Sequence, residues 1–546
     1  MSTTTLRDYA APAPVEVAAH PRSLAIPRLE TAALLLLLVL CAILRMVNLN
    51  ALPVFIDEGT YTQAARIVGA QPGPATLFIQ SAPNFGFNPP LFSWLAAPFT
   101  RLVPDPLLAA RLASACIGTV GMLATWATGR TLWGPLAGAL AGVLYALSPF
   151  VLFYNRMAML DGLLATCGTG ALFFALRLAR HGRARDVLGL GLCIAAGMST
   201  KLFAVNLLLL PLLAVTVAPP PRRRAVLRGG AIAIALGLLP LLYVYQNGAG
   251  LHGHLNTRDL ARTLGVVWLQ VSRWAGSLWL YLTPPVLLCA FVGLWSVRRE
   301  RPALLVGLWA LLGTVTIVVI PNTIFAPRYV LYSAVPIVLL SARGLLTLTT
   351  ALRARLRGRV ALPLLLAVAA ALVSIPAVTA DATTVGAPLQ ATLIPYDHWQ
   401  YATGWPSGET LTSAIAYLHK QAARHPIRVV SEDIPLYMLQ VALYDEKGIS
   451  WDEANFGHPR GLRAILKHAV RASGPSNVYL VDHRASGSHG DRRLPSKKGA
   501  VISDRVLTIL VNSPGPDGVD AYDVYGIATK TTPCKNLFGV HIGSCG

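Results

Sequence analysis

The chain has few charged residues, and few of those are carboxylates. Of its 546 residues only 13% are Asp, Glu, Lys or Arg, and 25 acidic side chains stand against 46 basic ones. With 54% hydrophobic residues and a mean hydropathy of +0.54, the chain has too little polar surface to cover a soluble core of this size. This composition excludes an ordinary soluble enzyme and predicts a membrane protein.

Several common ligand-binding motifs are also missing. No P-loop occurs, and no G-x-G-x-x-G lies between a predicted strand and a helix, so a soluble nucleotide has no visible phosphate cradle. The metal motifs H-E-x-x-H and C-x-x-C are absent, and we find no internal repeat. The chemistry of this chain must therefore reside in residues scattered along the sequence.

Long apolar runs are the main feature that is present. A span of about 18 or more apolar residues is typical of a transmembrane helix. The first run, at 30–47, has no small-residue cleavage site after it, which favours a retained helix over a signal peptide. Two short helices that meet at the polar turn "MSTKLF" are expected within 186–218. We predict about eleven helices, at 30–47, 107–128, 134–153, 161–179, 186–199, 202–218, 226–246, 277–297, 303–321, 329–348 and 360–379.

Arginine-rich loops predict the orientation. The loops "RLARHGRARD", "PPPRRRAVLR", "SVRRERP" and "RARLRGR" all fall on one side of the predicted membrane. The positive-inside bias makes that side cytoplasmic, and it explains the net charge of +21 without nucleic-acid binding. We therefore expect a plasma-membrane protein with a cytoplasmic amino terminus. Its regions are a disordered tail (1–28), a transmembrane domain (29–380) and an extracytoplasmic α/β domain (381–546).

The carboxy-terminal region reads as a soluble α/β domain. "IRVVSED", "NVYLVDH" and "AYDVYGIA" are predicted strands, whereas "PLYMLQVALYD" and "GLRAILKHAV" are predicted helices. Five cysteines lie in apolar spans and are expected to pack inertly. Cys534 and Cys545 are the two in the tail, and an oxidising location predicts a disulfide between them.

Six ionisable residues lie near predicted helix ends on the extracytoplasmic side. Ionisable groups at membrane depth are costly and are often functional, although snorkelling or helix-orienting ion pairs are the alternative. Adjacent carboxylates at 57 and 58 could likewise only cap the helix that follows them. Together the carboxylates and cations suit group transfer from a lipid-linked phosphate, with a carboxylate as base and cations on the phosphate. The six residues are Asp57, Glu58, Arg156, Asp161, Lys201 and Arg328.

The order of short motifs over residues 30–408 resembles the GT-C polytopic glycosyltransferases, in particular the protein O-mannosyltransferases and the lipid A aminoarabinose transferases. In the rest of the tail we recognise no family resemblance. The motifs are "IDEGTYTQAARIV" (56–68), "NPPLFSWL" (88–95), "RMAMLDGLLA" (156–165), "GMSTKLFAVNLLLLPLLA" (197–214), "APRYVLYSAVPIVLL" (326–340) and "YDHWQYATGWPSG" (396–408).

This resemblance implies transfer of a monosaccharide from a polyprenyl-phosphate donor to a hydroxyl of a protein, lipid or glycan, with inversion at the anomeric carbon. Asp57 resembles the catalytic base, whereas Glu58 and Asp161 resemble carboxylates that organise the acceptor or the site. The residues expected at the donor phosphate are Lys201, Arg328, Arg156, Asn88 and Tyr329.

The chain departs from this family at one position, and one cofactor is left open. Asn88 stands where related proteins often carry a cationic or imidazole side chain, so it can donate a hydrogen bond but adds no charge. Some members of the family are associated with a divalent metal, but this sequence offers no firm set of ligands.

Two other functions fit a polytopic protein. A lipid or polysaccharide transporter should show paired broken helices in repeated halves and ionisable residues near the membrane midplane. Here the ionisable residues collect at helix ends on one side, which favours an enzyme. A receptor whose tail is the functional part would not need about eleven helices for anchoring.

Overall fold

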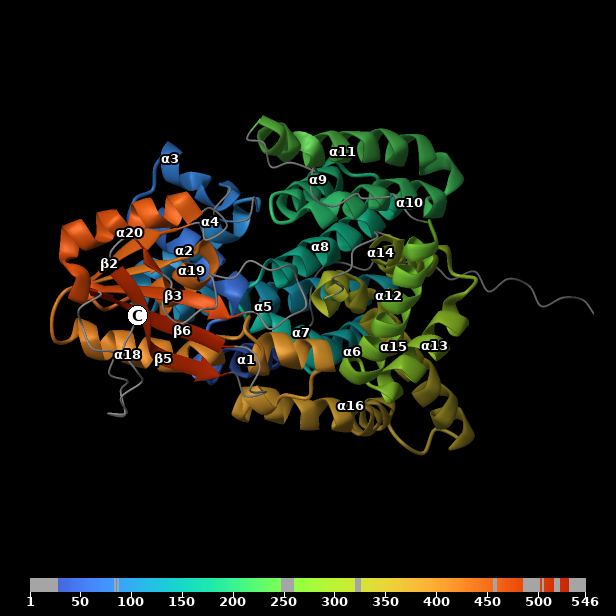
Figure 1. Cartoon of the computed structure of the whole chain (residues 1–546). Helices are drawn as coiled ribbons and strands as arrows, with labels where there is room; N and C mark the ends of the chain where they lie inside the picture. Colours follow the sequence, from blue (N-terminus) through green and yellow to red (C-terminus); the bar gives the residue numbers. More distant parts are fainter. Residues whose placement is uncertain are drawn as a thin grey trace, which may run out of the picture.

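The computed structural model describes residues 28–82, 85, 88–246, 260–319, 326–454, 459–484, 501–502, 505–514 and 521–529. The predicted amino-terminal tail and the predicted Cys534–Cys545 disulfide lie outside these residues. The sheet with its helices occupies one end of the molecule, and the long apolar helices occupy the other (Figure 1). Helices α2 and α4 lie between the two parts, where α2 packs against α19 of the sheet region.

The helices of the first half begin with α1, an apolar helix of 19 residues. Proline occupies the first turn of four of the helices that follow, where its missing N–H costs no hydrogen bond. The bounds are α1 Arg28–Met46, α2 Ile56–Ala70, α3 Pro74–Leu77, α4 Leu91–Leu102, α5 Pro106–Trp133, α6 Pro135–Ala146, α7 Pro149–Asn155, α8 Leu160–His181, α9 Ala184–Met198, α10 Leu209–Val217 and α11 Arg223–Gln246.

The second half of the helical part contains two turns that matter for the site, the 3₁₀ turn η7 and the π-helical turn η9. A third, the 3₁₀ turn η4 at Leu202–Leu208, follows α9 in the first half. The bounds are α12 Leu260–Tyr281, α13 Pro284–Val297, α14 Arg301–Val319, η7 Pro327–Val330, α15 Leu331–Arg355, α16 Leu362–Gly386, α17 Pro395–His398 and η9 Trp399–Thr403.

Within the described residues, six helices are long and apolar enough to cross a membrane, and up to eight if each of two bent pairs forms one span. The predicted number of about eleven is therefore not reached there. One reason is that α12 meets α13 at an angle of 105°; another is that the apolar segments Phe203–Val217 and Arg301–Leu312 are too short. The expected break within 186–218 is confirmed, since α9 ends at Met198 and η4 begins at Leu202.

Close helix contacts in the apolar part depend on glycine. A Cβ at Gly293 of α13 would lie 1.9 Å from the carbonyl oxygen of Leu340, and a Cβ at Gly344 of α15 would lie 1.8 Å from that of Cys289. The two backbones thus touch at a distance that no other residue permits. Such contacts between small residues drive helix association where the surroundings are as apolar as the side chains.

The carboxy-terminal part contains one mixed sheet of six strands in the order β2-β1-β3-β6-β5-β4. Strand β1 is parallel to both β2 and β3, and the remaining pairs are antiparallel. The bounds are α18 Thr412–Ala422, β1 Ile427–Ser431, α19 Asp433–Ala442, β2 Ile449–Glu453, α20 Pro459–Ser473, β3 Val478–Arg484, β4 Val501–Ile502, β5 Arg505–Pro514 and β6 Ala521–Thr529. The three predicted strands and two predicted helices are confirmed as β1, β3, β6, α19 and α20; the sequence analysis missed β2, β4 and β5.

Alternating side chains give this sheet two packed faces. Val429 packs in one cluster with α18 and α19, whereas its neighbour Val430 packs in another with α20. Helix α19 also contacts α2, so one side of the sheet is connected directly to the helix that carries Asp57. The sheet region is therefore part of the surroundings of the candidate site.

Candidate active site

Four of the predicted residues form one cluster of ion pairs. Arg328 Nη2 lies 2.8 Å from Asp57 Oδ2, and Lys201 Nζ lies 2.8 Å from Asp161 Oδ1. Arg328 Nε lies 3.9 Å from the other oxygen of Asp161, which joins the two pairs. These residues come from four separate segments of the chain, and the fold brings them together as the sequence analysis expected.

Local backbone structure places each member of the cluster. Asp57 lies in the first turn of α2 and Asp161 in the first turn of α8, where the helix dipole favours a carboxylate. Lys201 is the extended residue that precedes η4, and Arg328 lies within η7. Charged groups at helix ends can point across a gap between helices, which is what allows these four to meet.

Aromatic rings line the cationic side of the cluster. Lys201 Nζ lies 4.4 Å from the centre of the Tyr329 ring and 5.6 Å from that of Phe203. The guanidinium of Arg328 lies 5.3 Å from the centre of the Phe55 ring and 5.5 Å from that of Tyr329. Rings at these distances stabilise cations that are poorly hydrated. Tyr329 therefore contacts both cations, in agreement with its predicted place beside them.

The two carboxylates of the cluster differ in their exposure to solvent. The side chain of Asp57 is 31% exposed, whereas that of Asp161 is 2% exposed. Lys201 and Arg328 are 16% and 8% exposed. Among the described members of the cluster, Asp57 is thus the carboxylate that an incoming hydroxyl can reach most easily.

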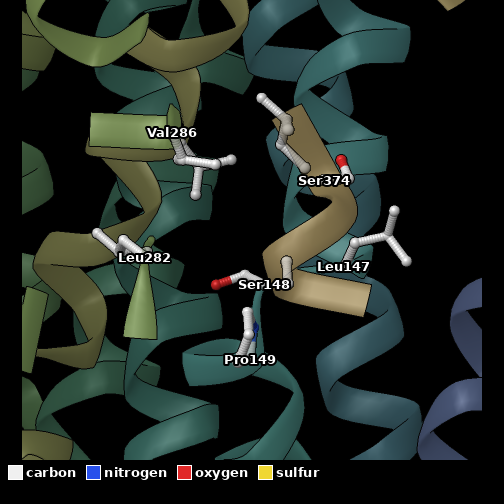
Figure 2. A pocket seen from close by; sticks show the side chains of 9 residues that line it. Leu147, Ser148, Pro149, Leu282, Val286 and Ser374 are labelled. Atoms are coloured by element: carbon white, nitrogen blue, oxygen red, sulfur yellow. The ribbon is translucent and has the colours of Figure 1, made fainter. Parts of the chain in front are cut away.

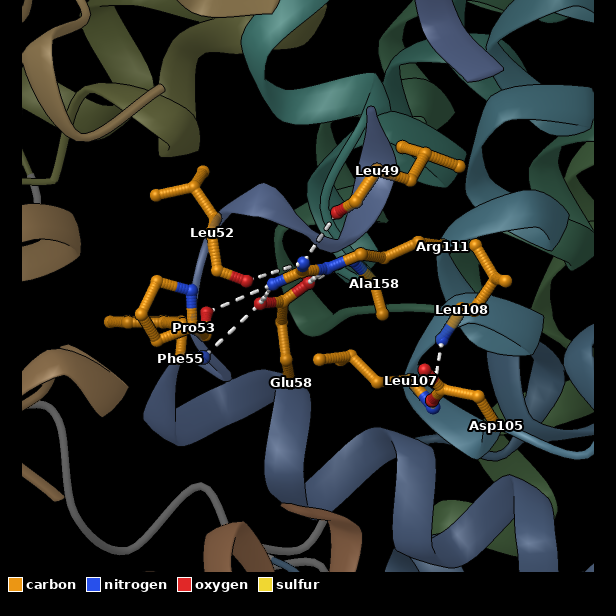
Figure 3. Close-up of polar contacts among 10 residues, drawn as sticks. All are labelled: Leu49, Leu52, Pro53, Phe55, Glu58, Asp105, Leu107, Leu108, Arg111 and Ala158. Atoms are coloured by element: carbon orange, nitrogen blue, oxygen red, sulfur yellow. Dashed lines mark hydrogen bonds and ion pairs between the residues drawn. The ribbon is translucent and has the colours of Figure 1, made fainter. Parts of the chain in front are cut away.

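Glu58 occupies a different environment from its neighbour (Figure 3). Its carboxylate is fully buried and accepts hydrogen bonds from Arg111 Nε at 2.8 Å and Arg111 Nη2 at 2.6 Å. The backbone amides of Ala158 and Phe55 donate to the same carboxylate at 2.7 Å and 3.1 Å. Of the two roles that the resemblance offers for Glu58, this closed network supports organising the site and leaves no oxygen facing an acceptor.

Arg111 completes that network and was missed by the sequence analysis. Its two terminal nitrogens also donate to the carbonyl oxygens of Leu49, Leu52 and Pro53 at 2.7–3.0 Å. Asp105 caps α5 by accepting from the amides of Leu107 and Leu108, which fixes the start of the helix that carries Arg111 (Figure 3). The signal in the sequence was an arginine within an apolar helix. If such a charged side chain is buried, it requires a partner.

Arg156 does not join the cluster and instead holds the end of α1. Its guanidinium donates to the carbonyl oxygens of Leu44 and Val47, both at 2.8 Å, and of Asn48 at 3.2 Å. Three carbonyl groups at a helix end attract a cation because they lack intrahelical partners. These contacts give Arg156 a structural role, and its predicted contact with the donor phosphate stays a prediction.

Asn88 lies in the turn before α4. Its side-chain amide donates to the carbonyl oxygen of Phe85 at 3.2 Å, its backbone amide donates to Gln80, and its own carbonyl accepts from Ser81. These contacts hold the turn in place. The predicted role of Asn88 at the phosphate stays a prediction.

Tyr61 is a further residue of the site that sequence reasoning missed. It follows Asp57 by four residues on α2, so both side chains face the same way. Burial raises the pKa of Tyr61 well above its usual value, and the nearby carboxylate of Asp57 raises it further, while Arg328 opposes this. The phenol therefore stays neutral and can donate a hydrogen bond beside the cluster. Its spacing of four residues from Asp57 was the signal in the sequence.

The described residues do not fit a resident metal ion. In that part of the chain no three His, Cys, Asp or Glu side chains lie close enough together to hold one. The two carboxylates of the cluster are paired with Arg328 and Lys201 instead. We therefore derive no step through a metal.

A small cavity lies among the apolar helices, away from these charges (Figure 2). The hydroxyls of Ser148 and Ser374 are its polar features, and none of the predicted site residues lines it. Its lining also includes Leu147, Pro149, Leu282 and Val286. Apolar walls without convergent charges do not suit a phosphate, so the ion-pair cluster is the candidate site.

Comparison with known proteins finds one matching family and several similar structures. Residues 88–245 match the family model described as dolichyl-phosphate-mannose-protein mannosyltransferase. The structure is similar to ArnT from Cupriavidus metallidurans in the apo state, with a TM-score of 0.56, 16% identity, and coverage of 91% of this chain and 97% of that chain. The chain has the fold of the GT-C glycosyltransferases. The resemblance found in its motifs is thereby confirmed.

A second GT-C structure carries a ligand. It is ArnT from the same organism bound to undecaprenyl phosphate, with a TM-score of 0.56, 17% identity, and coverage of 83% of this chain and 93% of that chain. At such low identity the similarity establishes the fold alone. No curated protein sequence matches the chain.

Proposed function

We propose that this chain is an integral-membrane, inverting glycosyltransferase. It transfers a monosaccharide from a polyprenyl-phosphate donor to a hydroxyl of a protein, lipid or cell-wall glycan on the extracytoplasmic side of the plasma membrane. The single observation that supports this most is the cluster in which a partly exposed carboxylate, Asp57, lies beside two cations, Arg328 and Lys201. The matched family segment and the ligand named for ArnT point to the same donor class.

In this proposal Asp57 acts as the general base. The acceptor oxygen attacks the anomeric carbon on the face opposite the phosphate, and the C–O bond to the phosphate breaks as the new C–O bond forms. The acceptor proton passes to an oxygen of Asp57, and the polyprenyl phosphate leaves as an anion. A hydroxyl is a poor nucleophile, and a positioned carboxylate contributes about 10²–10⁴-fold to such steps.

Lys201 and Arg328 stabilise the leaving phosphate. Charge-assisted hydrogen bonds from cations offset the negative charge that builds up on its oxygens. Arg328 reaches Asp57 at 2.8 Å through one nitrogen, so a phosphate oxygen can take the place of that carboxylate. Asp161, whose side chain is nearly fully buried, holds Lys201 in position through an ion pair at 2.8 Å.

The same proposal includes the predicted arrangement in the membrane. The amino terminus is cytoplasmic, residues 29–380 form the membrane domain, and residues 381–546 form an extracytoplasmic domain. Cluster residues then meet at the outer ends of their helices, where a polyprenyl chain can remain in the lipid while its phosphate reaches the cations.

A transfer assay tests this function. Purified protein in detergent is given a radiolabelled polyprenyl-phosphate sugar with candidate protein, lipid and glycan acceptors, and both labelled product and released polyprenyl phosphate are measured. We expect release of lipid phosphate in step with labelled product. If the protein binds polyprenyl phosphate no better than the uncharged polyprenol, the proposal is wrong.

A further inference from the structure

The connector between α16 and the sheet region contacts the charged cluster through Tyr401. It contains α17 and the π-helical turn η9, and its residues Asp397 and Tyr401 are both buried. Single π-helical turns are rare and occur frequently at functional sites, because they change the direction of a side chain without ending the helix. Here the turn carries Tyr401, whose hydroxyl contacts Arg328.

Asp397 is held by tyrosines from two other helices. Its Oδ2 accepts from the hydroxyls of Tyr154 in α7 at 2.6 Å and of Tyr281 in α12 at 2.5 Å. The side chain is fully buried, and its other oxygen has no hydrogen-bond partner among the described residues. A buried carboxylate with two phenolic donors fixes the connector against the helix bundle, since losing either donor would leave charge without compensation.

Tyr401 extends this arrangement to the cation. Arg328 Nη1 donates to its hydroxyl at 2.9 Å, while Arg328 Nη2 donates to Asp57 at 2.8 Å. The ring of Tyr401 is packed between Phe55, with centres 4.7 Å apart, and Phe153, at 5.2 Å. Neither the ring nor its hydroxyl can move far without disturbing this packing.

Because the guanidinium of Arg328 is planar, its contact with Tyr401 also determines the orientation of its other nitrogens. Its nitrogens form a rigid fork, so fixing Nη1 also fixes the direction in which Nη2 points. In this structure Nη2 points at Asp57. Without the hydroxyl of Tyr401, the guanidinium would keep its charge but lose its orientation toward the base.

We propose that Tyr401 is a positioning residue, which orients the guanidinium of Arg328 to receive the donor phosphate. This inference rests on the proposed function, since Arg328 must be a phosphate ligand for its orientation to matter. Asp397 and its two tyrosines anchor the segment from which Tyr401 acts. The connector thereby contributes to donor recognition although none of its residues needs to touch the phosphate.

Tyr401→Phe tests the proposal because it keeps the packed ring and removes only the hydroxyl. Binding of polyprenyl phosphate and of polyprenol is measured on purified full-length protein. We expect about tenfold weaker binding of polyprenyl phosphate, as for loss of one hydrogen bond to a charged group, and unchanged binding of polyprenol. Tyr145→Phe is the matched control: that tyrosine is equally buried but accepts from Asn155 at 3.3 Å, not from Arg328.

A double-mutant cycle with Arg328→Lys distinguishes positioning from general support of the fold. If Tyr401 acts through the guanidinium, Tyr401→Phe should weaken binding by less than twofold once Arg328→Lys is present. Equal losses in both backgrounds, or binding by Tyr401→Phe equal to that of the wild type, would overturn the positioning role. Wild-type protein that does not prefer polyprenyl phosphate over polyprenol would instead refute the proposed function itself.

Discussion

Arg328 Nη2 contacts Asp57 Oδ2 at 2.8 Å although the two residues are 271 positions apart in the sequence. The proposed base and the proposed phosphate ligand are thus paired with each other in this structure. A donor phosphate that binds Arg328 competes with Asp57 for the same N–H group. In the proposed mechanism, donor binding would thus release the carboxylate that acts as the base.

Asp57→Asn is expected to lower turnover about 10²–10⁴-fold, because it keeps the shape of the side chain but removes the proton acceptor. Binding of the lipid-linked donor should persist. Turnover of a radiolabelled polyprenyl-phosphate sugar and donor binding are measured on the same preparations. Near-normal turnover in this variant would exclude Asp57 as the base, and Asp161 would be tested next.

Lys201→Met and Arg328→Gln are each expected to weaken donor binding and to lower turnover, since a phosphate loses one of its two cations. Arg343→Gln is a suitable control, because that arginine pairs with Glu300 outside the cluster. The measurement is the affinity for polyprenyl phosphate together with kcat and KM for the donor. Unchanged binding and turnover in both variants would contradict the assignment.

Breaking the Glu58–Arg111 pair should mainly affect stability. Removal of one partner of a buried ion pair typically costs about 3–5 kcal/mol, because the other charge remains without compensation. We expect Arg111→Met to lower the melting temperature in detergent strongly. Glu30→Gln should have a small effect, since the Glu30–Arg130 pair is partly exposed. Similar melting temperatures for Arg111→Met and the wild type would contradict this structural role.

The raised pKa of Asp397 should make the free energy of unfolding depend on pH. Burial raises the pKa of Asp397 from 3.8 to about 6, against the opposing effects of its two tyrosine hydrogen bonds and Arg328. Between these two values the folded protein binds more protons than the unfolded chain, so stability falls as the pH rises. The stabilisation from this group is complete below about pH 4 and is lost as the pH passes about 6.

Asp397→Asn isolates that effect, because its side-chain oxygen can still accept from both tyrosines. The melting temperature of the variant should change less with pH between 4 and 6 than that of the wild type. Differential scanning fluorimetry at fixed ionic strength measures both curves. Parallel curves would show that Asp397 does not titrate in this range.

The orientation in the membrane can be tested at the basic turn before α11. Arg222→Cys should react with a membrane-impermeant maleimide only after the cytoplasmic side is opened, because arginine-rich loops stay inside. The background is a variant without its own cysteines, with activity as the control for folding. Labelling of this position from the outside alone would reverse the proposed topology.

The sequence predicted much of the cluster because charge is conspicuous in an apolar chain. Asp57, Asp161, Lys201 and Arg328 each lie near the end of a predicted helix, and the alternation of basic loops assigned them to one side. Arg156 followed the same rule but binds the end of α1, since composition does not tell whether a cation will meet a carboxylate or a helix terminus.

Other features depend on contacts between distant segments and could not be read from local patterns. Arg111 meets Glu58 across 53 residues, and Tyr401 meets Arg328 across 73. Strands β4 and β5 were missed although β5 pairs with the predicted strand β6. Within the described residues fewer helices qualify as spans than the sequence predicted, in part because hydropathy records apolar length but not the 105° bend between α12 and α13.

Gly59 follows the acidic pair on α2, and a Cβ there would lie 3.0 Å from the backbone nitrogen of Met438 and 3.1 Å from its Cα. A methyl group at 59 would press on the backbone of α19 as well as on the side chain of Met438, whose Cγ would lie 3.1 Å away. The packing of the helix with the proposed base and that of α19 therefore depend on each other. Exchanging the sheet region for that of a relative should succeed only when α2 is exchanged with it.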